Sequence, residues 1–269
     1  MKTAYATTLC NGDGYVPGVE ALGASLDRSG TSHDKLLLVT PDVPAEARLG
    51  LERRGWRSIE IEPLENPHPI EGQFFERFAA TFTKLRAFQL EEFDKLVMLD
   101  ADTIVLKNID DLFERPGLSA APDFLLPDRF NSGVMVIEPE RVLFERMLDA
   151  LAATPSYDGG DQGFLNTFFP HWYSGAAAHR LPCGYNMHQF IFQFLRAQPA
   201  LRAQVESEAK VVHYTVQKPW LAASTLAGGS EAWWDIYFEV HPDKASSWRR
   251  RMHAIEDWSF EQMLGTVLS

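Results

Sequence analysis

The sequence predicts an α/β protein: a single Rossmann-like domain whose central sheet is mostly parallel and is flanked by helices. Two observations predict this fold class. Short apolar runs bounded by turn residues alternate with segments whose apolar residues recur at helical spacing, and this alternation is typical of β-α-β units. The 269 residues, of which 45% are hydrophobic and 23% are charged, are also sufficient for one domain with a substantial core.

The alternation is clearest in the first hundred residues. The strand candidates are short, β-branched or leucine-rich runs. Because ligands of such sheets bind beyond the carboxyl ends of the strands, the loops that follow these strands are the expected binding site. The expected elements are, in order, a strand at 5–9, a helix at 19–28, a strand at 35–39, a helix at 44–55, a strand at 58–61, a helix at 83–93 and a strand at 95–100.

Composition and charge argue against several classes of function. The formal net charge of −12 argues against a nucleic-acid partner, because nucleic acids are bound through basic surfaces. No run of eighteen or more apolar residues occurs and the N-terminus has no signal-peptide pattern, so we expect a cytoplasmic protein. Cys10 and Cys183 are far apart in the sequence and predict buried thiols rather than a disulfide or a zinc site.

The most informative local pattern is an apolar strand that ends in two carboxylates. The strand at 95–100 ends in Asp100, and Asp102 follows after the single residue Ala101. Two carboxylates at the mouth of a sheet suit a hard divalent cation, which takes oxygen ligands and commonly shares them with a diphosphate. An Asp-x-Asp pair is also common in solvated turns, but its position after a buried strand favours the metal site.

Five other segments strengthen this interpretation. They are Leu9-Cys-Asn-Gly-Asp-Gly-Tyr15, Thr81-Phe-Thr-Lys-Leu85, Phe130-Asn-Ser-Gly-Val134, Asp158-Gly-Gly-Asp-Gln-Gly163, and Val212-His-Tyr214 followed by Lys218-Pro-Trp220. In this order, and over about residues 3–222, they resemble the glycogenin-like and galactinol synthase-like branch of glycosyltransferase family 8. The resemblance implies a GT-A fold and the retaining transfer of a hexose from a UDP-sugar.

The resemblance also assigns binding roles to individual residues. It implies a divalent cation, Mn²⁺ with Mg²⁺ as the alternative, that is held by Asp100, Asp102 and His213. The implied donor is UDP-glucose or UDP-galactose. The residues that the resemblance places at the donor and its metal are Leu9, Asn11, Tyr15, Arg77, Lys84, Asp100, Ala101, Asp102, Asn131, Ser132, Asp158, His213 and Lys218.

Three residues are expected to act in catalysis. Cleavage of the anomeric C–O bond leaves negative charge on UDP and oxocarbenium character on the sugar, so cations help on one side and carboxylates or amides on the other. The resemblance implies that Lys218 holds the diphosphate and that Asp161 and Gln162 face the hexose. The sequence leaves open whether Asp161 is a nucleophile or the reaction proceeds by a front-face route.

Two features depart from the family pattern. Four residues separate His213 from Lys218, one fewer than in the family, and none of the four is a glycine. Arg77 also lies at a different distance from the Thr-x-Thr-Lys segment, and a solvated surface arginine is an alternative interpretation. A lone histidine is more often a satisfied core or surface residue than a metal ligand, so the role of His213 depends on the geometry of the folded chain.

The acceptor is the part of the reaction that the sequence determines least. In glycogenin, the tyrosine that receives glucose lies shortly after a segment that resembles Leu181-Pro-Cys-Gly-Tyr-Asn186. Here the chain continues as Met187-His-Gln-Phe-Ile-Phe-Gln-Phe194, without a tyrosine. We therefore expect transfer to a separate small molecule, glycan or lipid-linked acceptor, and no self-glucosylation as a glycogen primer.

The chain is expected to divide into a catalytic domain at 1–222 and a helical tail at 223–269. Within the domain, the part up to about residue 107 is expected to bind the nucleotide, and the part at about 108–222 is expected to form the acceptor side. The tail carries an amphipathic face that includes Trp248. This face favours packing on the domain or in a homodimer over contact with a membrane.

Two other functions share parts of this pattern. A catalytically silent UDP-sugar-binding protein would keep the fold, but such a protein has no need of the full set of charged residues. A sugar-phosphate nucleotidylyltransferase also uses a doubly wound sheet and a divalent cation, but its first loop carries a basic residue. The loop at 11–14 contains neither lysine nor arginine, which disfavours that enzyme class.

Overall fold

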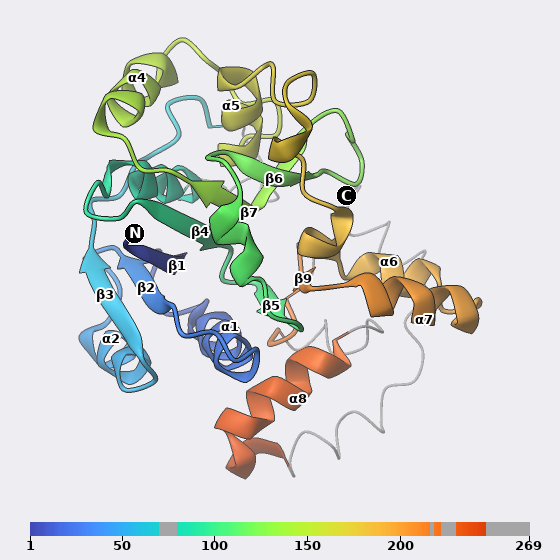
Figure 1. Ribbon diagram of the computed structural model, residues 1–269. Coiled ribbons are helices and arrows are strands. Elements are labelled where there is room, and N and C mark those ends of the chain that lie inside the picture. Colours follow the sequence, from blue (N-terminus) through green and yellow to red (C-terminus); the bar gives the residue numbers. More distant parts are fainter. Residues whose placement is uncertain (70–79, 216–217, 222–229, 246–269) are drawn as a thin grey trace.

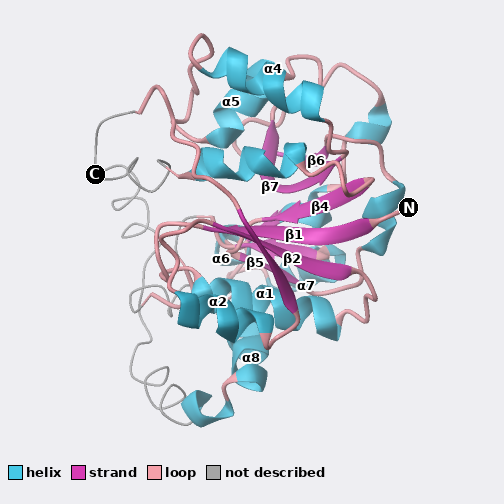
Figure 2. Ribbon diagram, turned by 90° about the vertical axis from the view of Figure 1, so that its left-hand side faces the viewer, coloured by secondary structure: helices cyan, strands magenta, loops and turns pink. Residues whose placement is uncertain are grey.

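The protein is a three-layer sandwich in which one mixed sheet lies between two layers of helices (Figure 1). The computed structural model describes residues 1–69, 80–215, 218–221 and 230–245. Turned by 90°, the chain shows α4 and α5 above the sheet and α1, α2 and α8 below it (Figure 2). The α/β fold with a central sheet and flanking helices is therefore confirmed.

The main sheet contains six strands and a smaller sheet contains three. The strand order in the main sheet is β3-β2-β1-β4-β7-β6, and the order in the small sheet is β5-β9-β8. The strands are β1 (Thr3–Leu9), β2 (Asp34–Val39), β3 (Trp56–Glu60), β4 (Lys95–Leu99), β5 (Thr103–Val105), β6 (Ser119–Pro122), β7 (Phe130–Ile137), β8 (Met187–His188) and β9 (Val211–His213).

Helices connect and cover these strands. The α-helices are α1 (Val16–Arg28), α2 (Ala45–Glu52), α4 (Arg141–Leu151), α5 (Asp161–Phe168), α6 (Phe190–Phe194), α7 (Pro199–Glu208) and α8 (Glu231–Val240). The 3₁₀ helices are η1 (Thr81–Gln89), η2 (Asp110–Glu114), η3 (Ala177–His179) and η4 (Cys183–Asn186).

The first four strands of the main sheet run parallel, and β7 runs in the opposite direction. β1 pairs in parallel with both β2 and β4, and β2 pairs in parallel with β3. β7 is antiparallel to β4, and β6 is antiparallel to β7. The parallel part follows from the β-α-β pattern of the sequence, and the antiparallel edge brings the loop after β6 to the same end of the sheet as the loop after β4.

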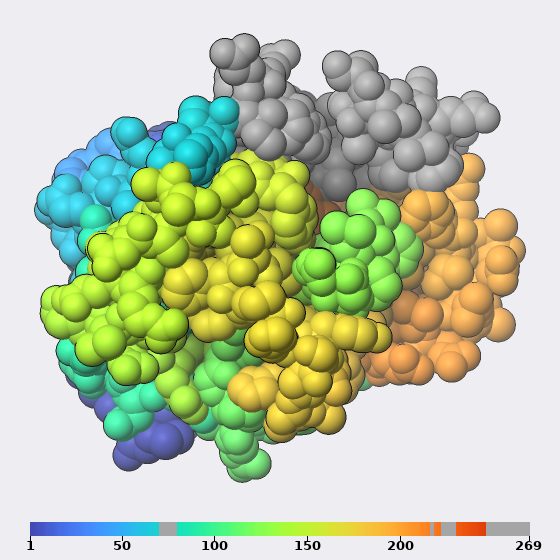
Figure 3. Space-filling view, turned by 90° about the horizontal axis from the view of Figure 1, so that it is seen from above, coloured from blue at the N-terminus to red at the C-terminus, as the bar shows by residue number. Residues whose placement is uncertain are grey.

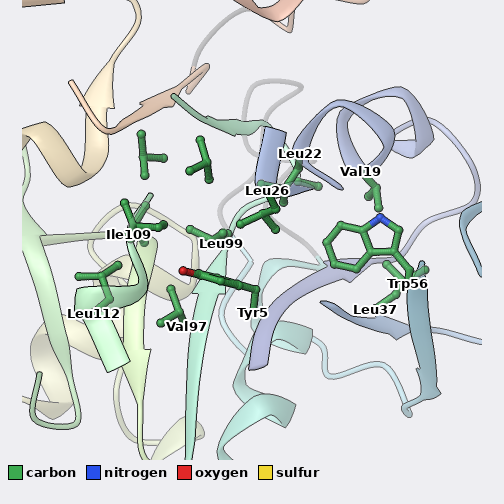
Figure 4. Close-up of a cluster of buried hydrophobic side chains, with 14 of the residues drawn as sticks. Tyr5, Val19, Leu22, Leu26, Leu37, Trp56, Val97, Leu99, Ile109 and Leu112 are labelled. Carbon is green, nitrogen blue, oxygen red and sulfur yellow. The ribbon is translucent and has the colours of Figure 1, made fainter. Parts of the chain in front are cut away.

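The parallel strands are buried on both faces, which explains their nearly continuous apolar sequences. Alternate residues of β1 enter different cores: Tyr5 and Leu9 pack toward α1 and α2, whereas Ala4 and Ala6 pack toward η1, α4 and α5. Figure 4 shows the first of these cores, where the Tyr5 ring lies among aliphatic side chains from β4, α1 and η2. The two cores fix the sheet between its helical layers.

The segment at 83–93, predicted as a helix, forms the 3₁₀ helix η1, which starts two residues earlier and ends at Gln89. A 3₁₀ helix has three residues per turn, so side chains three apart share one face. Phe82, Leu85 and Phe88 have this spacing, and all three are buried in the core. The apolar spacing of three therefore explains the difference from an α-helix.

Within the segment at 223–269, which was predicted as a helical tail, the described helix α8 packs on the rest of the chain. Trp233, Trp234, Ile236 and Tyr237 of α8 are buried in a third core that also contains residues of α1, β5 and β9. Trp248 and the rest of the predicted amphipathic face lie outside the described residues. Among the helices of the described ranges, none has the length and apolar character that a membrane crossing requires.

The two cysteines are free thiols. Cys10 is half-buried, and burial raises its pKa to about 11. Cys183 is exposed, so the prediction of a buried thiol is wrong at this position. Cys183 starts the short helix η4, where its side chain lies on the outer surface of the chain.

Candidate active site

The Asp-x-Asp segment lies where β4 ends, and two other strands hold its backbone. The amide of Asp100 donates to the carbonyl oxygen of Gly133 in β7 at 2.9 Å. The amide of Tyr214, directly after β9, donates to the carbonyl oxygen of Asp102 at 2.9 Å. Both bonds join segments far apart in the sequence, so the position of the two carboxylates depends on the complete fold.

Asp100, Asp102 and His213 form a cluster with the chemistry of a metal site. One ligand atom from each residue lies within 4.8 Å of the others. Nε2 of His213 lies 3.2 Å from Oδ1 of Asp102 and 3.8 Å from Oδ2 of Asp100. Two carboxylate oxygens and an imidazole nitrogen at this spacing fit one divalent cation of the Mn²⁺ type.

Lys84 lies between two carboxylates next to this cluster. Its Nζ lies 2.7 Å from Oδ1 of Asp100 and 3.0 Å from Oδ2 of Asp161. It also donates to the carbonyl oxygen of Ser132 at 3.3 Å. Burial lowers the pKa of Lys84, but attraction to the two carboxylates outweighs this effect and raises the pKa above its ordinary value. Lys84 is therefore a fixed positive charge in the centre of the site.

Lys218 pairs with the other carboxylate of the motif. Its Nζ donates to Oδ2 of Asp102 and to the carbonyl oxygens of Tyr214 and Thr215. Burial raises the pKa of Asp102, but Lys218 and His213 outweigh burial and hold the pKa well below its usual range. Asp102 is therefore ionised at neutral pH, as metal binding requires.

The first loop of the chain meets the returning segment near Lys218. The Tyr15 ring lies edge-on to the Trp220 ring with centroids 5.4 Å apart, and Nε1 of Trp220 donates to the carbonyl oxygen of Gly14 at 3.0 Å. Nζ of Lys218 lies 5.9 Å from the centroid of the Tyr15 ring. Asn11 lies in the same loop with a positive φ of 59°, which turns the backbone sharply after β1.

Leu9, directly before the first loop, and Ala101, between Asp100 and Asp102, are both buried. The carbonyl oxygen of Leu9 accepts from the amide of Thr40, so its backbone links β1 to the end of β2. The carbonyl oxygen of Ala101 lies so close to Gly18 that a Cβ on Gly18 would be 2.2 Å from it. Close packing of α1 thus fixes the backbone of the motif.

The acidic loop before α5 supplies the remaining predicted residues. Oδ1 of Asp158 accepts from the amides of Gly160 and Gly163, both at 3.0 Å, and so shapes its own loop. Asp161 starts α5 and points to Lys84. Gln162 reaches the other way, because its Oε1 accepts from the amide of Ser132 at 3.3 Å.

A chain of hydrogen bonds determines which nitrogen of His213 faces the carboxylates. Asp123 accepts from Nδ2 of Asn131 at 3.1 Å, and Oδ1 of Asn131 accepts from Nδ2 of Asn186 at 2.8 Å. Oδ1 of Asn186 then lies 2.9 Å from Nδ1 of His213. Because an amide oxygen can only accept, Nδ1 donates to Asn186, and Nε2 is the nitrogen that faces the two carboxylates.

Asp123 and Asn186 were not predicted as site residues. Nε2 of Gln162 also donates to Oδ2 of Asp123 at 3.3 Å, so Asp123 joins the acidic loop to this hydrogen-bond chain. Asp123 follows β6 directly, and the argument that identified Asp100, a carboxylate after an apolar strand, could have found it. Asn186 ends η4, and the sequence around it gives no such signal.

Next to His213 lies a second buried histidine. His188 in β8 is paired in register with His213 in β9, and the two ring centroids are 5.7 Å apart. Burial, with a smaller effect of His213, lowers the pKa of His188 to about 4. His188 is therefore a neutral imidazole at neutral pH. Among the predicted site residues, Arg77 lies outside the described ranges.

Comparison with known proteins identifies the family. No family model matches the chain. The chain is 38% identical over 250 residues to glycogenin-1 from Oryctolagus cuniculus, and the match covers 86% of this chain and 74% of that glycogenin. It is also 37% identical over 220 residues to putative UDP-glucuronate:xylan alpha-glucuronosyltransferase 5 from Arabidopsis thaliana. This match covers 82% of this chain and 37% of that relative.

A solved structure confirms the fold. The galactosyltransferase LgtC, in complex with donor and acceptor sugar analogs, matches with a TM-score of 0.63 at 17% identity, covering 88% of this chain and 95% of that structure. The likeness establishes the GT-A fold, and the identity to glycogenin-1 establishes the family. The chain therefore belongs to glycosyltransferase family 8, in its glycogenin-like branch, and is a hexosyltransferase.

Proposed function

We propose that this protein transfers glucose or galactose from the UDP-sugar to a separate acceptor with retention of configuration, and that it requires Mn²⁺ or Mg²⁺. The observation that carries the proposal is the cluster of Asp100, Asp102 and His213 at the end of β4. These residues would hold the cation. When bound, a divalent cation neutralises the negative charge that develops on the departing diphosphate.

Two lysines supply positive charge from the chain itself. Lys218 pairs with Asp102, and its Nζ lies 5.9 Å from the centroid of the Tyr15 ring, so its charge would reach a diphosphate that is bound against the loop at 11–15. Lys84 is held between Asp100 and Asp161, so it links the metal side of the site to the expected hexose side. Fixed charges of this kind lower the free energy of a transition state without reorganisation during the reaction.

The arrangement supports an electrostatic role for Asp161 over a nucleophilic one. The carboxylate of Asp161 is buried and engaged by Lys84, and an ion-paired carboxylate has less negative charge available for attack at carbon. Gln162 is positioned by Asp123 and Ser132, which fits a residue that orients the hexose. We therefore favour a front-face route in which Asp161 stabilises positive charge on the sugar.

The test is UDP release from a panel of UDP-sugars, with Mn²⁺ or with EDTA. We expect release with UDP-glucose or UDP-galactose that stops in EDTA and in Asp102→Asn. A matched control is Asp149→Asn, which changes an exposed carboxylate on α4. Release that survives EDTA would contradict the role of the cation. Binding of UDP without any release, also after an acceptor glycoside is added, would indicate a silent binding protein.

A mass measurement tests the separate acceptor. After incubation with donor and Mn²⁺, we expect the intact mass of the purified chain to remain unchanged. Addition of one or more hexose units to the chain would instead show self-glycosylation. Peptide mapping would then identify the residue that accepts the sugar.

A further inference from the structure

His188 is a buried histidine beside the cluster of Asp100, Asp102 and His213, and its ring has unsatisfied hydrogen-bonding groups. His188 is 5% exposed, yet within the described ranges neither Nδ1 nor Nε2 has a hydrogen-bond partner. Because His188 is paired in register with His213, both side chains lie on the same face of the small sheet. His213 belongs to the cluster with Asp100 and Asp102, so His188 lies directly beside that cluster.

An unpaired imidazole at this place indicates a ligand. A buried donor or acceptor without a partner destabilises the folded chain, whereas an apolar residue of similar size would not. A neutral imidazole offers one donor and one acceptor. A sugar hydroxyl can both donate and accept, and is therefore a matching partner for His188.

An exposed apolar surface starts at this histidine. The Phe190 ring lies 5.3 Å from the His188 ring, and the Phe124 ring lies 5.1 Å from Phe190. The rings of Phe124 and Phe194 are stacked with centroids 6.4 Å apart. Leu125 and Leu126 follow Phe124 in the loop between β6 and β7. We call these residues the apolar wall: Phe124, Leu125, Leu126, Phe190 and Phe194.

The apolar wall is accessible and continuous with the active site. Phe124 is 48% exposed and Leu125 is 77% exposed. In Figure 3 the green loop between β6 and β7 projects beside the orange segment that holds α6 and α7. The same loop begins with Asp123, which accepts hydrogen bonds from Asn131 and Gln162. One loop therefore contacts the expected hexose site and contributes Phe124, Leu125 and Leu126 to the apolar wall.

We propose that His188 and the apolar wall form the acceptor subsite, and that the acceptor is a glycoside with an apolar group. The inference rests on the proposed function, because it names the acceptor class for that reaction. The sugar of the acceptor hydrogen-bonds to His188, and its apolar group lies against Phe124 and Leu125. A glycan without an apolar group would leave this surface in water.

The transfer step balances without a further reactant. The oxygen of an acceptor hydroxyl forms a bond to the anomeric carbon of the hexose. The bond from that carbon to UDP breaks, and its electron pair leaves with UDP. The proton of the hydroxyl group passes to the departing phosphate oxygen.

The test compares two acceptors that differ only in their apolar group. Methyl β-D-glucopyranoside and hexyl β-D-glucopyranoside are incubated with the full chain, Mn²⁺ and UDP-glucose or UDP-galactose, and product formation is measured. We expect kcat/KM to be about tenfold higher for the hexyl glycoside, as burial of about two methylene groups predicts. UDP release to water without acceptor is measured in parallel.

Variants separate the two parts of the subsite. Phe124→Ser changes an exposed residue and is expected to bring the hexyl-to-methyl ratio of kcat/KM close to one. His188→Phe is expected to lower kcat/KM for both glycosides about tenfold with little change in their ratio, because a lost neutral hydrogen bond has this size. His188→Asn, which keeps a donor and an acceptor, should recover part of the loss. Leu201→Ser, in an exposed apolar residue of α7, is the matched control and should keep both the ratio and UDP release.

The outcomes distinguish this inference from the proposed function. Equal kcat/KM for the two glycosides, or no transfer to either while UDP is released to water, would overturn the acceptor assignment and leave the donor reaction intact. An unchanged ratio in Phe124→Ser would also overturn it. No UDP release from any donor would overturn the proposed function, and the acceptor subsite with it.

Discussion

The proposed donor side, around Lys84 and Lys218, and the proposed acceptor side, around His188, satisfy their polar groups in different ways. On the donor side, Lys84 pairs with two carboxylates and Lys218 pairs with a third. On the acceptor side, His188 has no hydrogen-bond partner in the described part of the chain, and its neighbour Phe124 is about half exposed. The donor side is thus organised by its own charges, whereas the acceptor side has groups that a ligand can satisfy.

The two regions would specify different parts of the proposed reaction. A nucleotide diphosphate and a cation are highly charged, and a site for them needs fixed charges with defined separations. An acceptor contributes a hydroxyl group and a shape, so its site needs few charges. Changes on the donor side should therefore affect all reactions of the protein, and changes on the acceptor side should alter the choice of acceptor.

The largest expected effect is on the donor side. Asp102→Asn removes a charge that is expected to ligate the cation, and keeps the shape of the side chain. We expect kcat/KM for transfer to fall by about 10³-fold or more, as for loss of a strong electrostatic interaction at a reaction centre. Steady-state kinetics with a saturating cation checks the change, and activity within tenfold of wild type would contradict the proposed site.

The next effect tests the central lysine of the donor side. Lys84→Met leaves Asp100 and Asp161 without their shared cation. We expect the free energy of unfolding to fall by about 3 kcal/mol, because removal of one partner leaves uncompensated buried charge. Denaturant titration measures the change. Lys2→Met is the control, because the Lys2–Glu92 pair is exposed and should contribute less than about 1 kcal/mol.

A smaller effect is expected from a glycine that touches His213. A Cβ on Gly133 would lie 2.2 Å from Cε1 and 2.4 Å from Nδ1 of His213, so Gly133→Ala must displace the imidazole. We expect affinity for Mn²⁺ to fall by about 10- to 100-fold, as for other disturbances of ligand orientation. Gly50→Ala is the matched control, since a Cβ there meets no atom within 4 Å. Equal affinity in both variants would show that His213 is not a ligand.

The smallest expected effect concerns the acceptor side and depends on pH. His188 has its pKa lowered to about 4 in the folded chain, against about 6.5 for an unfolded histidine. Between these values the unfolded chain binds more protons, so stability falls as the pH decreases. The contribution between pH 6.5 and pH 5 is about 2 kcal/mol. In His188→Phe, the free energy of unfolding should change less between pH 6.5 and pH 5 than in the wild type. The same change in both proteins would contradict the lowered pKa of His188.

The sequence indicated where Asp100 and Asp102 would lie, because they are in a loop directly after a strand. Asp100 and Asp102 could be placed from one apolar strand, and strands of one parallel sheet carry their loops to the same edge. The geometry of Lys84 could not be predicted, because it depends on a 3₁₀ helix where an α-helix was expected. The sequence did contain a signal for the 3₁₀ helix, because its large apolar residues recur strictly every three positions, whereas those of an α-helix alternate between three and four.

The acceptor side was harder to predict, since its contacts join segments that are distant in the sequence. Asn186 and His188 acquire their positions from pairing of β8 with β9, and these strands contain only two and three residues. Strands of this length give no periodic signal. The sequence of the phenylalanine-rich segment at 187–194 does not indicate which rings are exposed, and in the folded chain Phe194 is about half exposed.

In the proposed reaction, Asp100, Asp102 and His213 hold the cation that the UDP-sugar donor requires. Calorimetric titration of Mn²⁺ into the full chain with UDP present tests this role. We expect one Mn²⁺ to bind per chain, and Asp102→Asn to weaken binding by at least about 100-fold while the fold is retained. Equal Mn²⁺ affinity in the variant, or UDP binding that is the same with EDTA, would contradict the account.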